Sequence, residues 1–310
     1  MKPIVLATSP LYRPTLERLE REFTVHRLWE AADPGAMLAT LAPTCEAVAA
    51  SHTLTAATMR ALPKLKVVAV FGVGYDAVDV GYARQHGIGV TNTPGVLSDE
   101  LADFAVGLLI AVRRRIVAAD RFVRAGTWLE RGFPLNDKVS GSKVGILGLG
   151  RIGKVLARRL AAFDCEIHYH GRQAQPDQPH RYQPDLTEMA RAVDNLIAVV
   201  PDSASTRGLV SRAVLEALGP KGVFVNIGRG SVVDEAALVE LLANGKLGGA
   251  GLDVFVDEPR VPEALFALDS VVLQPHQGSG TRATRIAMGN LMIDNLAAHF
   301  AGKPLLTPVV

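Results

Sequence analysis

The chain has few cysteines, almost no net charge and no long apolar run. Its two cysteines, Cys45 and Cys165, lie far apart and in no metal-ligand spacing, so neither a disulfide framework nor a metal site is expected. The 33 basic residues nearly balance the 31 acidic ones, and the net charge of +2 therefore gives no reason to expect a nucleic-acid partner.

The apolar segments are all short. The first eight residues read as a short strand and lack the longer apolar core of a signal peptide. No run approaches the ~20 apolar residues of a membrane span. With 48% apolar and 21% charged residues, the composition is that of an ordinary soluble protein with a sizeable core. We therefore expect a cytoplasmic protein with reduced thiols and no membrane contact.

Predicted strands alternate with helical stretches along the chain, which is typical of doubly wound parallel α/β sheets. A long apolar helix from Ser98 marks the passage from a first set of strands to a second. A final helix over 281–301 is expected to return to the first domain. The sequence thus predicts a discontinuous domain of residues 1–97 and 287–310, and a nucleotide-binding domain of residues 98–286.

Residues 144–153 are the most informative stretch, because an apolar run there ends in Gly-x-Gly-x-x-Gly and a helical pattern follows. Gly148 allows a tight turn, Gly150 lets the backbone approach a pyrophosphate, and Gly153 lets the helix pack on the strand. The first N–H groups of the helix would hold the diphosphate. A tight turn without a ligand is the alternative. The predicted contacts are Gly148, Leu149, Gly150, Arg151 and Ile152.

The second strand of this unit ends in His170-Gly171-Arg172-Gln173, where an acidic residue would normally hold the ribose 2′-hydroxyl of NAD. Arg172 stands there instead, and a guanidinium can hold a 2′-phosphate through two parallel hydrogen bonds. We therefore predict that Gly171 and Arg172 favour NADP(H), with NAD(H) still possible. The alternative is that Arg172 is a solvated loop charge.

Three polar residues, Arg229, Glu258 and His276, lie just past predicted strand ends of the second domain. The carboxyl ends of parallel strands open onto one edge of the sheet, where the glycine turn also lies. A lone residue of this kind is most often a surface group, but three of complementary chemistry on one edge indicate a site.

The three residue types suit one reaction, in which a carbonyl gains a hydride. Histidine can supply the proton to the carbonyl oxygen. A neighbouring carboxylate, Glu258, would orient His276 and favour its charged form. Arg229 can hold the substrate carboxylate and polarise the carbonyl. Backbone N–H groups of residues 72–74 could bind the same carboxylate.

At this point the chain resembles the D-isomer-specific 2-hydroxyacid dehydrogenases over nearly its whole length. The stretches that carry the resemblance are 71–79, the glycine turn, 226–230, 251–255 with Glu258-Pro259, and 275–279. The resemblance implies a Rossmann domain, a flavodoxin-like discontinuous substrate domain and a homodimer built on the long helix region.

The resemblance also implies roles for individual residues. Arg229, Glu258 and His276 would be the catalytic arginine, glutamate and histidine. Substrate contacts would be Val73, Gly74, Arg229, His276 and Ser279. Further cofactor contacts would be Val200, Pro201, Ile227, Gly228, Asp253, His276 and Gly278. Trp128 either reaches the site of a partner subunit or packs in the dimer.

Residues 169–172 resemble the glyoxylate/hydroxypyruvate reductases, which tend to prefer NADPH. We expect no regulatory domain of the kind that the longer phosphoglycerate dehydrogenases carry, and a small oxoacid is therefore the expected substrate. The expected activity is NADPH-dependent reduction of a small 2-oxoacid to the D-2-hydroxyacid, with His276 as general acid and base. One alternative is a larger 2-oxoacid of phenylpyruvate or branched-chain type, with Leu54, after Ser51-His52, near its pocket. The other is a non-catalytic dinucleotide sensor or corepressor, which would not need the three catalytic residues.

Overall fold

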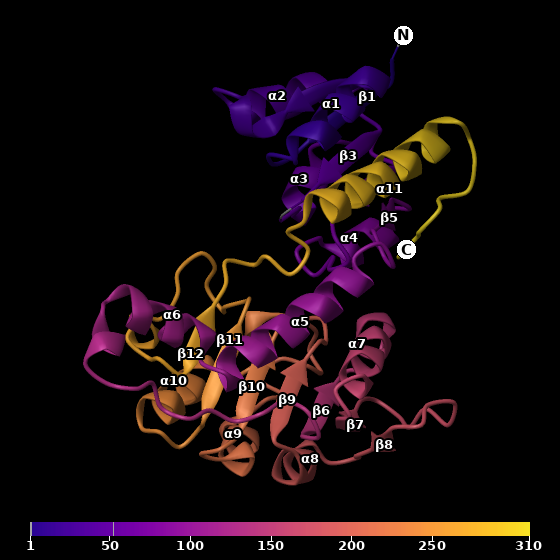
Figure 1. The fold of residues 1–310 in the computed structure, drawn as a ribbon. Coiled ribbons are helices and arrows are strands. Elements are labelled where there is room, and N and C mark those ends of the chain that lie inside the picture. Colours follow the sequence, from indigo (N-terminus) through magenta and orange to yellow (C-terminus); the bar gives the residue numbers. More distant parts are fainter. Residues whose placement is uncertain (1, 52) are drawn as a thin grey trace. The chain divides into compact units, whose positions relative to one another are not determined.

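The computed structural model describes residues 2–51 and 53–310, and the chain forms two compact units (Figure 1). The first unit is Met1–Leu97 with Gly280–Val310, and the second is Ser98–Ser279. The return to the first unit thus falls at 279/280, whereas the sequence places it at 286/287. The physical reason is that helix α11 (Arg282–Phe300) packs on α1 and β4 of the first unit, so its first turns belong there.

The first unit contains a five-stranded parallel sheet in the order β2-β1-β3-β4-β5, which is the flavodoxin order. This confirms the predicted topology. The strands are β1 (Ile4–Ala7), β2 (Thr24–Arg27), β3 (Ala47–Ala50), β4 (Val67–Val70) and β5 (Gly89–Thr91). The helices are α1 (Arg13–Glu22), η1 (Leu28–Glu30), α2 (Pro34–Leu41), α3 (Ala56–Arg60) and α4 (Val80–Gln85), joined by α11 from the end of the chain.

Apolar side chains cover both faces of this sheet, as expected for parallel strands. Leu6, Val48 and Val68 pack with side chains of α2 and α3 in one cluster. On α11, Gly289 permits close packing on α1, because a Cβ there would lie 2.1 Å from the Thr15 hydroxyl.

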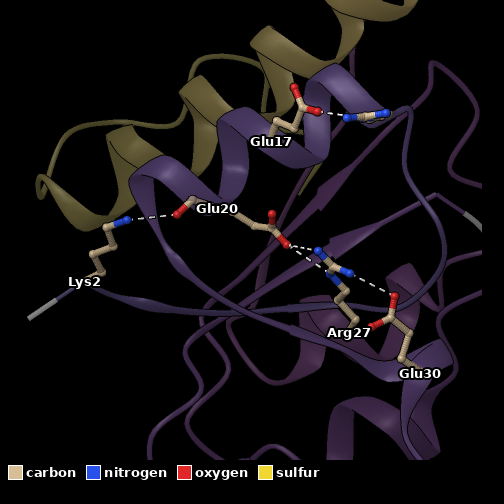
Figure 2. A network of polar contacts seen from close by, with 6 residues as sticks. Lys2, Glu17, Glu20, Arg27 and Glu30 are labelled. Atoms are coloured by element: carbon tan, nitrogen blue, oxygen red, sulfur yellow. Dashed lines mark hydrogen bonds and ion pairs between the residues drawn. The ribbon is translucent and has the colours of Figure 1, made fainter.

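The two edges of this sheet are protected differently. At the β2 edge, Figure 2 shows Arg27 between Glu20 and Glu30, with the Arg27–Glu30 bond at 3.0 Å. Lys2 donates to the main-chain oxygen of Glu20 at 2.9 Å in the same view. Such exposed pairs stabilise little, but charged groups on an edge strand discourage pairing with other chains. The β5 edge is covered by the C-terminal residues of the chain, which hydrogen-bond to Val90.

The second unit contains a seven-stranded parallel sheet in the order β12-β11-β10-β9-β6-β7-β8, which confirms the predicted Rossmann arrangement. Its strands are β6 (Lys143–Leu147), β7 (Glu166–His170), β8 (Arg181–Tyr182), β9 (Asn195–Ala198), β10 (Val223–Asn226), β11 (Gly249–Leu252) and β12 (Val271–Leu273). The order reverses between β6 and β9, so the glycine turn after β6 lies at the topological switch point.

The helices form a layer on each face of this sheet (Figure 1). Helices α5 (Ser98–Arg113) and α7 (Arg151–Ala161) pack together on one face. On the other lie α8 (Leu186–Ala192), α9 (Arg212–Leu218) and α10 (Glu235–Ala243). Short 3₁₀ turns are η2 (Thr127–Leu129), η3 (Gly230–Val232) and η4 (Glu263–Leu265), and α6 spans Ile116–Arg124.

Helix α5 ends on a buried arginine. Arg113 is buried, and its guanidinium donates to Asn195 Oδ1 at 2.7 Å and to the main-chain oxygens of Lys221 and Asp194. Arg115 then takes a left-handed conformation with φ of 47°, which separates α5 from α6.

Among the described residues, no helix is long and apolar enough to cross a membrane, and both cysteines are buried and free.

Candidate active site

The glycine turn after β6 has the geometry expected of a dinucleotide site. Gly148 has φ of 101°, and a Cβ there would lie 2.6 Å from Val200 Cγ1. A Cβ on Gly153 would lie 2.1 Å from the Gly148 carbonyl oxygen, so α7 can start close to the strand only with glycine at this position. A Cβ on Gly150, in contrast, would meet no described atom within 4 Å, and no side chain caps α7. The turn therefore leaves an open, positively polarised helix start that fits a diphosphate.

Neighbouring strand ends meet this turn. Val200 follows β9 and touches both Gly148 and Gly228, since a Cβ on Gly228 would lie 2.6 Å from the Val200 carbonyl oxygen. Gly230 packs against the segment after β11, because a Cβ there would lie 2.0 Å from the carbonyl carbon of Phe255. Val200 thus brings the segments after β9 and β10 into contact with the glycine turn. Pro201 and Ile227, the other predicted cofactor residues here, are the sequence neighbours of Val200 and Gly228, and Ile227 is buried.

The loop after β7 carries Arg172 as an exposed residue and is tied down around it. The Tyr182 hydroxyl donates to the Gly171 carbonyl at 3.2 Å. The Gln175 N–H donates to the Tyr169 hydroxyl at 2.7 Å, and its side chain donates to the Leu149 carbonyl at 2.9 Å. Gln175 thus joins the loop that carries Arg172 to the glycine turn.

A buried asparagine shapes the turn that carries Arg229. Asn226 is fully buried at the end of β10. Its Oδ1 accepts from the Gly228 N–H at 3.0 Å, and its Nδ2 donates to the Arg229 carbonyl at 2.9 Å. The Arg229 guanidinium itself donates to the Gly228 carbonyl at 2.8 Å. The side chain therefore starts from a fixed backbone, as a group that orients a ligand requires.

Glu258 and His276 form a hydrogen-bonded pair. His276 Nδ1 lies 2.8 Å from Glu258 Oε2, and Glu258 Oε1 accepts from the Phe255 N–H at 3.1 Å. A carboxylate only accepts, so Nδ1 carries a proton and Nε2 is the nitrogen that can exchange one with a ligand. The His276 side chain is 48% exposed, so this exchange is sterically possible.

The charges around this pair favour ionised Glu258. Burial opposes its ionisation, but the hydrogen bond and charge of His276, the Phe255 N–H and the charge of Arg229 together hold the pKa of Glu258 below its ordinary value. The influence of Arg229 links this guanidinium electrostatically to the pair.

Asp253 supports the segment that carries His276. It is buried, and its two carboxylate oxygens accept from the N–H groups of Gln277 at 2.6 Å and Gly278 at 2.8 Å. The His276 N–H donates to the Asp253 carbonyl at 2.9 Å, and His276 has a positive φ of 54°. Burial raises the pKa of Asp253 against the opposing effect of these N–H groups. Ser279, the last residue of the second unit, follows this segment and is half-buried.

An apolar pocket of about 280 Å³ adjoins the pair. Glu258 and His276 form one part of its wall. The remaining lining is mostly apolar and comes from Phe255, Pro259, Val261, Phe266, Leu273 and Pro275, with Gln274 as its one further polar residue.

In the first unit, Val73 and Gly74 follow β4 and are both half-buried. The Val73 carbonyl accepts from Asn92 Nδ2 at 2.8 Å, and the Gly72 carbonyl accepts from the Thr93 N–H at 2.8 Å. Ser51 bonds Ser9 through their hydroxyls, and Leu54 is buried in the apolar cluster of this unit rather than presented to a ligand. His52 lies outside the described residues.

The structure thus gathers the predicted residues of the second unit on one sheet edge and adds residues that the sequence did not indicate. Asn226 and Gln175 act through hydrogen bonds to the backbone. Asn226 stands inside a motif stretch, and its position directly before a glycine-rich turn could have marked it as a turn-shaping residue. Gln175 had no comparable signal.

Comparison with known proteins agrees with this geometry. Residues 106–278 match the family described as D-isomer specific 2-hydroxyacid dehydrogenase, NAD binding domain. The chain is 46% identical to glyoxylate/hydroxypyruvate reductase A HPR2 of Arabidopsis thaliana, over 99% of this chain and 98% of that protein. It is 47% identical to hydroxyphenylpyruvate reductase of Plectranthus scutellarioides, with the same coverage.

A crystal structure gives the same result for the fold. The NADPH-dependent glyoxylate/hydroxypyruvate reductase of Sinorhizobium meliloti, in complex with NADP and malonate, superposes with a TM-score of 0.94 at 47% identity, over 100% of this chain and 97% of that one. The chain is therefore a member of the D-isomer-specific 2-hydroxyacid dehydrogenase family and an NAD(P)-dependent oxidoreductase.

Proposed function

We propose that the protein reduces a small 2-oxoacid of the glyoxylate or hydroxypyruvate type to the D-2-hydroxyacid, with NADPH as reductant. The observation that carries this proposal is the His276–Glu258 hydrogen bond of 2.8 Å, with Arg229 nearby, on the sheet edge that holds the glycine turn. Relatives named glyoxylate/hydroxypyruvate reductase support the substrate class.

The chain's own residues would manage the proton and the charge. A bound reduced nicotinamide supplies the hydride to the carbonyl carbon. His276 Nε2 gives a proton to the carbonyl oxygen as the C–O π bond breaks, so one hydride and one proton yield the hydroxyl product. Glu258 stabilises the imidazolium before the transfer and fixes the ring through Nδ1. His276 is reprotonated from solvent before the next turnover.

Binding of the substrate is assigned to charged and backbone donors. The Arg229 guanidinium would hold the carboxylate and polarise the carbonyl. The N–H groups of Val73 and Gly74 would bind the same carboxylate, and Ser279 would lie near the substrate. Asp253 would contribute by holding the Gln277–Gly278 backbone beneath His276.

The preference for NADPH is assigned to Arg172. The Tyr182, Tyr169 and Gln175 contacts fix the loop around it, so its charge is presented from a preorganised backbone. Residues 170–174 contain no carboxylate that would repel a 2′-phosphate. The relative from Sinorhizobium meliloti, named NADPH-dependent, supports the assignment.

A larger, aromatic 2-oxoacid is the second candidate substrate. The apolar pocket of about 280 Å³ beside His276 is large enough for a phenyl ring, since cavities of about 150 Å³ hold benzene. The relative named hydroxyphenylpyruvate reductase points in the same direction.

The test is the initial rate of NADPH and NADH oxidation with glyoxylate, hydroxypyruvate and phenylpyruvate. The proposal expects the highest kcat/KM with NADPH and one of the two small acids. A higher kcat/KM for phenylpyruvate would favour the second candidate. Tight NADPH binding without turnover of any oxoacid would contradict both and favour a dinucleotide sensor.

We also propose a homodimer that uses the arm formed by α6 and η2. This arm exposes apolar side chains that a monomer has no reason to present, with Trp128 68% and Leu129 94% exposed. Light scattering of the wild type and of a Leu129→Asp variant tests the proposal. A dimer that the substitution dissociates would support it, and a wild-type monomer would refute it.

A further inference from the structure

The Val73–Gly74 peptide is held from its carbonyl side. Asn92 Nδ2 donates to the Val73 oxygen at 2.8 Å. In a planar trans peptide the C=O and the next N–H point in opposite directions, so a bond to the Val73 oxygen also sets the direction of the Gly74 N–H. Donation to the carbonyl polarises the peptide as well, which strengthens that N–H as a donor.

Asn92 is in turn held by the end of the chain. The Thr307 hydroxyl donates to the Asn92 carbonyl at 2.6 Å. Around it, residues 306–310, here called the C-terminal strap, run antiparallel to β5. Val309 N–H donates to Val90 O at 2.7 Å, Val90 N–H donates to Val310 O at 3.1 Å, and Thr91 pairs with Pro308.

Helix α11 fixes the strap through Asn295, which is fully buried. Its Nδ2 donates to Leu291 O at 2.8 Å and to the Thr307 hydroxyl at 2.9 Å. Its Oδ1 accepts from the N–H groups of Leu306 at 2.9 Å and Thr307 at 3.1 Å. All four hydrogen-bonding positions of the amide are therefore used.

The direction of every bond in this series is determined. Asn295 Nδ2 can only donate, so the Thr307 hydroxyl must accept a hydrogen bond from it and donate one to the Asn92 carbonyl, which can only accept. Coverage of the β5 edge alone would need only the backbone bonds at Val90. The side-chain series continues past the end of β5 and ends on the Val73–Gly74 peptide, which carries the Gly74 N–H.

We propose that Asn295, Thr307 and Asn92 form a positioning relay, through which the C-terminal strap orients the Gly74 N–H toward the substrate carboxylate. This inference rests on the proposed function, in which Val73 and Gly74 bind that carboxylate. None of the three residues is assigned a role in hydride or proton transfer.

The test compares three single variants of the full-length protein. Thr307→Val removes the hydroxyl and keeps the shape, whereas Thr307→Ser keeps the hydroxyl. Thr91→Val is the matched control, because the Thr91 hydroxyl is buried one residue from Asn92 and has no hydrogen-bond partner among the described residues. For Thr307→Val we expect the KM for glyoxylate to rise about tenfold, with kcat within about twofold and NADPH affinity unchanged.

Thr307→Ser and Thr91→Val should keep a KM close to that of the wild type. Equal effects of Thr307→Val and Thr91→Val on KM would overturn the relay, because the loss would then follow packing rather than the hydrogen bond. A fall in kcat or in NADPH affinity without a change in KM would overturn it as well.

Amide hydrogen exchange of residues 72–75 provides a readout that does not depend on turnover. Faster exchange in Thr307→Val than in Thr91→Val is expected if the strap fixes this loop. Unchanged exchange would overturn the relay. A wild type that turns over no oxoacid would refute the proposed function instead, and the exchange result would still decide whether the strap holds the loop.

Discussion

In both units, hydrogen bonds of a fully buried asparagine lead to a predicted site residue, but over different distances along the chain. Asn226 bonds Gly228 and Arg229, two and three residues ahead of it. Asn295 bonds Leu306 and Thr307, and the hydroxyl of Thr307 bonds Asn92, 215 residues away in the sequence. The same amide chemistry therefore produces a local turn in one unit and a link between distant segments in the other.

The two units therefore have different proposed roles in the reaction. In the second unit, the groups assigned to proton transfer and cofactor binding stand within a few residues of a strand end, and their hydrogen-bond partners lie between 2 and 26 residues away in the sequence. In the first unit, the loop assigned to the substrate carboxylate depends on the end of the chain. Substitutions in the second unit should therefore lower kcat or cofactor affinity, and they should also raise the KM for the oxoacid where they disturb Arg229. Those in the first unit should change the KM for the oxoacid alone.

The largest effect is expected for His276→Asn. This change removes the proton donor, and general acid catalysis typically contributes about 10²- to 10⁴-fold, so kcat should fall on the order of 10³-fold. NADPH affinity, measured by fluorescence titration, should stay close to that of the wild type. Retention of more than a tenth of kcat would break the assignment of chemistry to the second unit.

Glu258→Gln should lower kcat on the order of 10²-fold, because the amide cannot stabilise the imidazolium.

The fold holds the pKa of Glu258 below its ordinary value of 4.5, so the ionised carboxylate stabilises the folded state above that pH. This contribution is lost as the pH falls through the lowered pKa. Urea unfolding should therefore show a wild-type advantage at neutral pH that shrinks below about pH 4.5. A stability advantage of the wild type over Glu258→Gln that grows as the pH falls would contradict this prediction.

Alanine at Asn226 and alanine at Asn295 test whether the two units differ in this way. Each substitution leaves backbone groups unsatisfied and should cost about 2 kcal/mol of unfolding free energy. Their kinetic effects should differ. Asn226→Ala should lower kcat, because Arg229 polarises the carbonyl less well, and should also raise the KM for glyoxylate, whereas Asn295→Ala should raise that KM alone. Identical kinetic profiles would show that the two units do not divide the work in this way.

Arg172→Ala should raise the KM for NADPH about tenfold and leave the KM for NADH unchanged, because only NADPH carries the 2′-phosphate. Gln175→Ala should have a smaller effect of the same kind, about threefold, because it acts through the loop backbone. Gln178→Ala is the matched control, since the Gln178 side chain bonds only Asp177 among the described residues. Equal changes in the KM for NADPH and the KM for NADH would show that Arg172 contributes to the binding of both cofactors and does not select between them.

The distance along the chain between interacting residues also decides what could be predicted from the sequence. Both sheets follow from the alternation of strands and helical stretches along the chain. The glycine turn and the neighbourhood of His276 and Glu258 follow from short motifs at strand ends, which the parallel topology brings to one edge. The burial of Arg113 could not be predicted, because its partners belong to segments near residues 195 and 221. The link from Thr307 to Asn92 has the same cause, since no local pattern encodes a side chain that bonds a distant carbonyl.

The most direct test of the proposed activity is the configuration of the product. Purified protein is incubated with NADPH and hydroxypyruvate, and the glycerate that forms is resolved by chiral chromatography. We expect stoichiometric oxidation of NADPH and formation of D-glycerate alone. L-glycerate, a racemic product or no glycerate would contradict this expectation.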